Sequence, residues 1–292
     1  MIHTIKNDFL QVSVNQKGAE LFSIKSVLTG EEYMWEPDPA IWESTSPVLF
    51  PIIGCLKDDS YIYDGKQYSL PRHGFIRGNE NLILENQTQS SLTFSLEYSD
   101  ETLKIYPFRF KFTIHYILEN NKIKVFQSVC NLGDEEMFFS LGGHPAFNCP
   151  LMDHKKYNDY FLEFDKEETA FCYGPLKNGL IGSETRSIIE EGKKIYLNNH
   201  TFDEGALVFK RLNSSNITLI NNSWGPRIRV NFESFPYLGI WAKPKARFVC
   251  IEPWFGIADS WNTEGKLETK EGILFLEAGV SFETEYIIEI LN

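Results

Sequence analysis

A histidine that follows two glycines and precedes a proline is the first candidate for chemistry. His144 lies in the segment SLGGHPAFN, after Gly142 and Gly143 and before Pro145. The glycines allow close backbone approach or a positive φ, and the proline biases the preceding residue towards extended backbone. The direction of the imidazole is therefore restricted, which favours a functional side chain. An alternative stays open, in which a Gly-Gly bulge at a strand end happens to contain a histidine.

A glutamate that ends an apolar run is the second candidate. Glu252 follows the run 248–251 and precedes Pro253 and Trp254 in RFVCIEPWFGIADS. Such a run is typical of a buried strand, so the carboxylate is either desolvated with a raised pKa or held by hydrogen bonds. Both are states of a tuned base. The alternative is a glutamate that caps the strand and points into water.

A second histidine lies in the segment LPRHGFIRG. His73 is flanked by Arg72 and Arg77, and Pro71 and Gly74 interrupt any regular strand. We interpret this segment as a loop, and loops held by a rigid sheet often carry binding groups. A surface turn with a hydrogen-bonded histidine is the alternative.

Metal and cofactor sites have little support in the sequence. Two histidines and one carboxylate can ligate zinc, but His73, His144 and Glu252 are far apart and have no metal-binding spacing. The five cysteines contain no C-x-x-C pair, and we interpret them as reduced thiols. We therefore expect no metal and no cofactor.

The elements that position these residues are predicted to be antiparallel strands. Apolar residues alternate with polar ones in 92–98, 108–116 and 282–290, as in half-buried strands. Asp64 and Gly65 have the residue types of a tight hairpin turn within YIYDGKQY. No segment pairs a strand with a helix of about 10 to 15 residues, as a parallel α/β fold requires.

Composition agrees with an all-β protein. Aromatic residues make up 14% of the 292 residues, and aromatic side chains favour sheets. No linker or repeat divides the chain, so we expect one domain over residues 1–292. The segment of about 153–199 has the weakest pattern and is interpreted as an excursion from this domain.

Charge and hydropathy exclude two classes of partner. The net charge of −12 argues against binding to a nucleic-acid backbone. The N-terminus has no apolar signal core, and the longest stretch without polar side chains, 47–56, is too short to cross a bilayer. We expect a cytoplasmic protein that binds neither nucleic acid nor membrane.

Five ordered segments resemble the aldose 1-epimerase (galactose mutarotase) superfamily, and more closely its LacX-like branch of mutarotase-related proteins. They are PVLFPIIG, LPRHGFIRG, GGHPAFN, HTFDEGALVF and CIEPWFGIADS. The similarity runs essentially from end to end and begins with GAELFSIKSVLTGEEYMW. The resemblance implies a large antiparallel β-sandwich with few short helices, which binds a sugar on a concave sheet.

The resemblance also implies an activity, the interconversion of the α and β anomers of a free hexose without a cofactor. His144 matches the general acid, which protonates the ring oxygen, and Glu252 matches the general base, which removes the proton of the C1 hydroxyl. The residues implied for sugar binding are His73, Asp203, Trp254 and Phe147. Asp203 is also our candidate for stabilising the imidazolium form of the acid.

One position departs from the family pattern. Where the family usually carries a basic residue after FPIIG, this chain has Cys55, and a thiol cannot replace a guanidinium. Arg72 is the candidate to reach the same ligand atoms. Two alternatives stay open: a hexose-6-phosphate 1-epimerase that uses Arg72, Arg77 and Lys57 for the phosphate, and a non-catalytic sugar-binding protein of the same fold.

Overall fold

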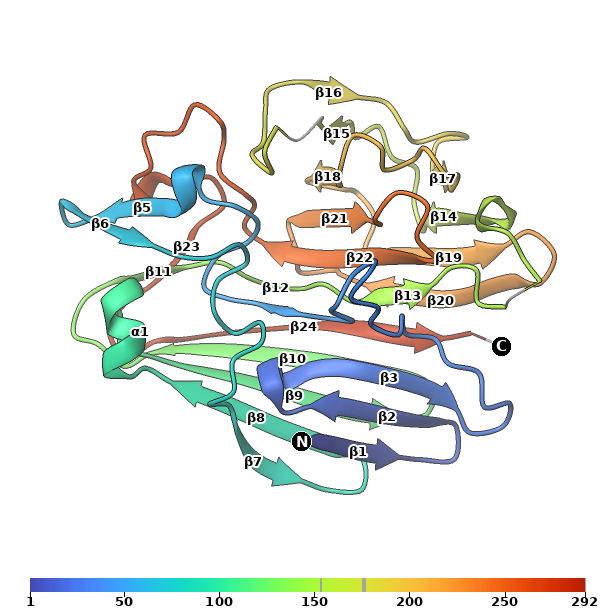
Figure 1. The fold of residues 1–292 in the computed structure, drawn as a ribbon, viewed down its shortest axis with the longest axis horizontal. Coiled ribbons are helices and arrows are strands. Elements are labelled where there is room, and N and C mark those ends of the chain that lie inside the picture. The colour runs from blue at the N-terminus through green and yellow to red at the C-terminus, as the bar shows by residue number, and fades with distance from the viewer. Residues whose placement is uncertain (153, 175–176, 292) are drawn as a thin grey trace.

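The expected all-β fold is confirmed by the structure, a computed structural model that describes residues 1–152, 154–174 and 177–291. Strands form nearly all of its regular structure (Figure 1). In the described part of the chain, helix is limited to α1 (Asp100–Ile105) and four short 3-10 turns, and no helix is long and apolar enough to cross a membrane. The 3-10 turns are η1 (Lys17–Ala19), η2 (Lys57–Asp59), η3 (Tyr157–Asp159) and η4 (Leu267–Thr269).

The larger sheet has nine antiparallel strands. Its order is β17 (Lys194–Tyr196), β14 (Tyr160–Phe164), β19 (Asn216–Asn221), β20 (Gly225–Asn231), β24 (Ser281–Ile290), β10 (Lys122–Asn131), β9 (Phe110–Glu119), β8 (Ser91–Glu97) and β7 (Ile83–Gln87). Buried and half-buried residues alternate along β9 and β10, as their sequence pattern predicts. One face of this sheet therefore packs against the core.

The second sheet has eight strands and carries the site described below. Its order is β16 (Thr185–Arg186), β15 (Cys172–Tyr173), β18 (Leu207–Lys210), β21 (Tyr237–Trp241), β22 (Phe248–Phe255), β12 (Leu141–Gly143) and β4 (Val48–Leu49), and β13 (Ala146–Asn148) also pairs with β22. Seven of the eight residues of β22 are buried. This central position explains the unbroken apolar run before Glu252.

Gly142 and Gly143 allow the two sheets to approach each other. A Cβ atom on Gly143 would lie 2.5 Å from the hydroxyl oxygen of Tyr286 on β24. The side-chain amide of Gln127 on β10 donates a hydrogen bond of 3.2 Å to the carbonyl of Gly142. The pair of glycines before His144 therefore serves close approach between the layers of the sandwich.

Smaller sheets complete the fold. A three-stranded sheet contains β1 (Ile2–Lys6), β2 (Leu10–Asn15) and β3 (Glu20–Ser26), and two further pairs join β11 (Met137–Phe139) with β23 (Leu274–Leu276) and β5 (Ser60–Tyr63) with β6 (Lys66–Ser69). The predicted turn between β5 and β6 is confirmed, with φ angles of 46° at Asp64 and 68° at Gly65.

The prediction that residues 153–199 form an excursion was wrong for the described part of that segment. Strands β14 and β17 extend the nine-stranded sheet, and β15 and β16 lie in the eight-stranded sheet. These strands have only two to five residues each, separated by polar turns, so period-two alternation could not reveal them.

Candidate active site

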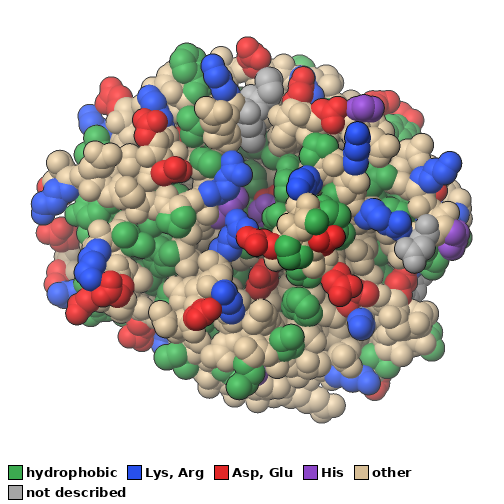
Figure 2. Space-filling model, in the orientation of Figure 1, with side chains coloured by type: hydrophobic (Ala, Val, Ile, Leu, Met, Phe, Trp, Pro, Cys, Tyr) green, Lys and Arg blue, Asp and Glu red, His purple; other side chains and the backbone are tan. Residues whose placement is uncertain are grey.

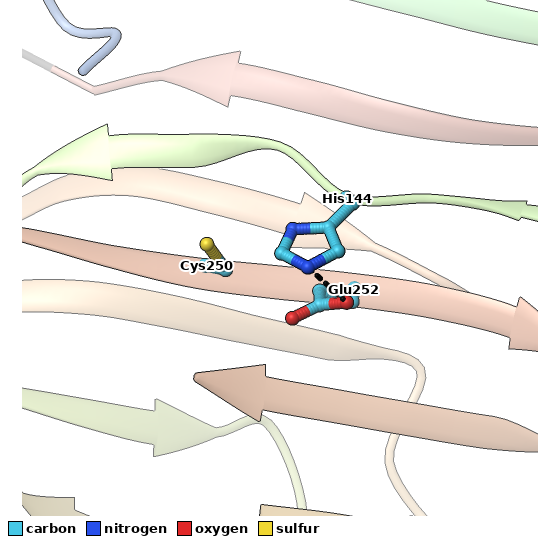
Figure 3. Close-up of side chains that lie close together, drawn as sticks. All are labelled: His144, Cys250 and Glu252. Atoms are coloured by element: carbon cyan, nitrogen blue, oxygen red, sulfur yellow. Dashed lines mark ion pairs between the residues drawn. The ribbon is translucent and has the colours of Figure 1, made fainter. Parts of the chain in front are cut away.

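His144 and Glu252 meet because the strands on both sides of His144 pair with the strand that carries Glu252. Strands β12 and β13 both run along β22, and the N–H of Ile251 donates a hydrogen bond of 3.1 Å to the carbonyl of Pro145. The loop that holds the imidazole is thereby fixed above the carboxylate (Figure 3). The distance between Nε2 of His144 and Oε2 of Glu252 is 3.1 Å.

This pair is buried but has unused hydrogen-bonding capacity. His144 is 7% exposed and Glu252 is 1% exposed. Although Nε2 and Oε2 are close, Oε2 has no hydrogen-bond partner of acceptable geometry, and neither has Nδ1 of His144. Buried polar atoms are rarely left without a partner, and their presence here favours a site that a ligand completes.

Burial shifts both pKa values towards the neutral forms. It raises the pKa of Glu252 well above its usual range, with the Trp254 indole and the Arg72 charge acting in the opposite direction. Burial also lowers the pKa of His144 to about 3. The 3.1 Å contact by itself favours the charged forms, but desolvation of two groups this buried is the larger effect. We therefore expect the pair to share one proton near neutral pH, held on Glu252 while the cavity is empty.

A stability measurement can test the shifted pKa of Glu252. The folded protein keeps a proton that the unfolded chain releases above about pH 4.5. The contribution of Glu252 to stability is therefore present at low pH and is lost as the pH rises through its raised pKa. Glutamine stays neutral, so Glu252→Gln should gain stability relative to the native protein between about pH 5 and pH 8. Urea unfolding at both pH values measures the change.

The control for this experiment is Glu264→Gln, which removes a carboxylate whose side chain is 80% exposed. A stability difference between Glu252→Gln and the native protein that stays constant across the same pH range would mean that Glu252 is already ionised in the folded state.

A cavity of about 260 Å³ opens above the pair. This volume lies just below the range of roughly 300–1,000 Å³ that is typical of small-ligand sites. Figure 2 shows the hollow near the centre of the face in view, with histidine side chains visible between those of lysine or arginine. The charged and titratable residues that line the cavity are Arg72, His73, Arg77, His144 and Glu252.

His73 lines the cavity as a hydrogen-bond donor. Its ring centroid lies 5.5 Å from that of His144, with the two rings nearly perpendicular. The N–H of Gly54 donates a hydrogen bond of 3.1 Å to Nδ1 of His73, so the proton of the neutral ring is on Nε2. Burial and the positive charges around it hold the pKa of His73 well below its usual range. His73 can therefore donate a hydrogen bond to a ligand, but it is a poor general acid.

Three tryptophans form the apolar walls of the cavity. Trp254 lines it as the sequence led us to expect, together with Trp42 and Trp241, which sequence reasoning missed. The ring of Trp42 lies 5.2 Å from that of His144 at an interplanar angle of 31°, and the ring of Trp241 lies 5.9 Å from it. Trp42 belongs to no motif, so nothing in the sequence connects it with His144.

Two expected binding residues do not line the cavity, which corrects the sequence-based assignment. Phe147 is fully buried in the hydrophobic core. Phe147 belongs to β13, where successive side chains point to opposite faces of the sheet. It is therefore close to His144 along the chain, but its ring does not face the cavity. Asp203 is exposed, and its carboxylate pairs with Nδ1 of His200 at 2.7 Å instead of approaching His144. The same turn reaches the cavity through Gly205 and Ala206.

The atoms that could hold a metal differ from those the sequence suggested. Nε2 or Nδ1 of His144, Sγ of Cys250 and a carboxylate oxygen of Glu252 lie within 4.8 Å of one another (Figure 3). A thiol must lose its proton to bind a metal, and burial raises the pKa of the Cys250 thiol well above its usual range. A metal bound by this cluster would therefore have to displace the thiol proton of Cys250.

Comparisons with known proteins identify the family and the fold of this chain. A family model described as aldose 1-epimerase matches residues 1–271. Protein LacX of Lactococcus lactis subsp. lactis is 35% identical over 299 residues, which cover 99% of each chain. The crystal structure of a galactose mutarotase related enzyme from Lactobacillus acidophilus is 38% identical, with a TM-score of 0.94 and coverage of 100% of this chain and 98% of that one. A galactose mutarotase-like protein from Lactobacillus casei is 28% identical, also with a TM-score of 0.94 and full coverage of both chains.

Proposed function

The chain belongs to the aldose 1-epimerase family, and we propose that it is a cytoplasmic, cofactor-independent isomerase that interconverts the α and β anomers of a free hexose. The observation that carries the proposal is the 3.1 Å contact between Nε2 of His144 and Oε2 of Glu252 at the cavity. The two oxygens that react in a cyclic sugar, O1 and the ring oxygen O5, are bonded to the same carbon. An acid and a base that act on them must therefore lie side by side.

The reaction moves one proton at each of these oxygens. The Glu252 carboxylate removes the proton of the C1 hydroxyl, and the electron pair of that O–H bond forms the carbonyl. The bond between C1 and O5 breaks, and O5 takes a proton from the imidazolium of His144. The open aldehyde rotates about its C1 to C2 bond and closes on the other face by the reverse transfers.

Burial of the pair favours ring opening. The proton that Glu252 holds in the empty cavity must first pass to Nε2 of His144 across the 3.1 Å contact, which gives the carboxylate and the imidazolium, and after ring opening both groups are neutral again. Because burial raises the pKa of Glu252 and lowers that of His144, the neutral pair is stabilised in the cavity. Burial thus stabilises the protonated Glu252 and the neutral His144 that ring opening produces. Asp203 is not needed for this.

The walls of the cavity match a monosaccharide. Trp42, Trp241 and Trp254 offer apolar surfaces for the C–H faces of a pyranose, and Nε2 of His73 offers a donor for a hydroxyl. Ligand sites are commonly lined by aromatic side chains with a few polar groups that fix orientation.

Polarimetry tests the proposed activity. Freshly dissolved α-D-glucose and α-D-galactose should reach anomeric equilibrium faster with the protein than in buffer alone. If neither sugar equilibrates faster than the buffer control, the proposed activity is refuted for both. Tight sugar binding by calorimetry without a rate enhancement would instead favour the non-catalytic sugar-binding protein.

A hexose 6-phosphate is the second candidate substrate, because both Arg72 and Arg77 line the cavity. Two guanidinium groups suit a phosphate better than a neutral hydroxyl. D-glucose 6-phosphate should then compete with D-glucose, and its advantage should shrink as the salt concentration rises. Equal inhibition at low and high salt would exclude a phosphate contact.

A further inference from the structure

Cys55 lies directly behind an arginine of the cavity. Nε of Arg72 donates a hydrogen bond of 2.9 Å to Sγ of Cys55. Gly54 and Arg72 line the cavity, whereas Cys55 is not among the lining residues. The thiol is thus placed to hold the guanidinium and not to touch a ligand.

This hydrogen bond decides which atoms of Arg72 remain for a ligand. A guanidinium has five N–H donors in a planar fork, and the bond to Cys55 uses only the one on Nε. The four donors on the two Nη atoms stay free of that contact. The positive charge also lies near both reacting groups, since it lowers the pKa of Glu252 and of His144.

Gly179 closes the other side of the guanidinium. A Cβ atom at this position would overlap Nη2 of Arg72 and would lie 2.8 Å from Sγ of Cys55. The surrounding turn is fixed, because Lys177 and Leu180 exchange two backbone hydrogen bonds and Ile181 donates one of 2.8 Å to the carbonyl of Asp259. The φ of 80° at Gly179 further favours glycine. The guanidinium therefore lies between the thiol and a backbone that leaves no room for a methyl group.

We propose that Cys55 and Gly179 are positioning residues that hold the Arg72 guanidinium against the bound sugar. One short segment then orients both binding groups of the neighbouring loop: Gly54 holds His73 through its N–H, and Cys55 holds Arg72 through its thiol. This inference rests on the proposed function, because it needs a sugar in the cavity.

The test compares Cys55→Ala, Arg72→Ala and the double variant with D-glucose and D-galactose. A thiol sulfur is a weak acceptor and Arg72 is exposed, so the loss of this contact in Cys55→Ala should raise KM severalfold, by less than Arg72→Ala does, with a smaller change in kcat. If Cys55 acts only through Arg72, the double variant should have the KM of Arg72→Ala alone. Cys55→Ser keeps an acceptor and should recover most of the loss. Cys130→Ala is the control, since it removes another half-buried thiol, on β10 and outside the lining of the cavity.

Gly179→Ala should raise KM in the same way, because its methyl group would displace the guanidinium. The inference is overturned if Cys55→Ala leaves KM unchanged while Arg72→Ala raises it, or if the two effects add in the double variant. A crystal structure of Cys55→Ala with Arg72 in its native position would overturn it as well.

The same set of variants separates this inference from the proposed function. If no anomer interconversion is found but the sugars bind, the Kd from tryptophan fluorescence replaces KM in every comparison. In that case the proposed activity is refuted, but the Kd values of the variants still show whether Cys55 positions Arg72. If the protein is active and Cys55→Ala leaves KM unchanged, the proposed activity stands and the positioning role of Cys55 is refuted.

Discussion

Replacing Glu252 by glutamine is expected to lower kcat for anomer interconversion by a factor of roughly 100 to 10,000, the range for a positioned acid or base. Glutamine nearly matches glutamate in shape but cannot accept the proton of the C1 hydroxyl. The fold of β22 and the walls of the cavity should persist, because the new side chain occupies the same buried place. Polarimetry gives kcat, and quenching of Trp42, Trp241 and Trp254 fluorescence gives sugar affinity.

The expected pattern is a large loss of kcat with a Kd that changes little. His144→Gln should show the same pattern, and the double variant should lose little more than either single one, because the acid and base act together. Glu168→Gln is the matched control. Glu168 is also buried, at 6% exposure, but it accepts hydrogen bonds from the backbone of Asn213 and Ser214 and does not line the cavity. Retention of more than about a tenth of native kcat in Glu252→Gln would mean that another group is the base.

Strands were predictable from the sequence where a long run alternates. In β9 and β10 one face is buried over ten residues, and in β24 over the last seven, so the period of two is clear. The pairing of β24 with both β10 and β20 was not predictable, because it joins residues far apart along the chain. Short strands such as β15 and β16 have too few residues for any pattern.

His144 and Glu252, which meet at the cavity, each stood out in the sequence for a local reason. Both residues precede a proline, His144 also follows two glycines, and Glu252 follows an apolar run that is typical of a buried strand. The residues alone left an alternative open for each, and only the resemblance to the family implied that they act together. Trp42, Trp241 and Gly179 were not predictable, because tertiary packing alone brings them to the cavity. Phe147 was wrongly assigned for the converse reason: nearness along the chain is not nearness in space.

A buried ion pair apart from His144 and Glu252 leads to the second large effect. Nζ of Lys270 lies 3.0 Å from Oδ1 of Asp259, and the side chains are only 3% and 4% exposed. Asp259 also connects the loops near the cavity, since Oδ2 accepts a hydrogen bond of 3.0 Å from the N–H of Lys57 and its backbone carbonyl accepts one from Ile181. The pair therefore holds the loop after β22 against two other segments.

Lys270→Met should lower the free energy of unfolding by about 3–5 kcal/mol, because it leaves the carboxylate of Asp259 buried without its counter-charge. Urea unfolding at neutral pH measures the change. The control is Lys104→Met, which breaks a pair with Glu101 whose side chains are 66% and 80% exposed. Exposed pairs of this kind contribute little, so this variant should remain close to the native stability.

A second substitution identifies the origin of the loss. Lys270→Met combined with Asp259→Asn removes the uncompensated charge and keeps an oxygen that can accept the N–H of Lys57. If the charge is the cause, the double variant should be more stable than Lys270→Met alone, even though it departs further from the native sequence. If both variants are equally unstable, the loss comes from the packing of the lysine stem and not from the carboxylate. The ion pair would then be an incidental feature of a well-packed loop.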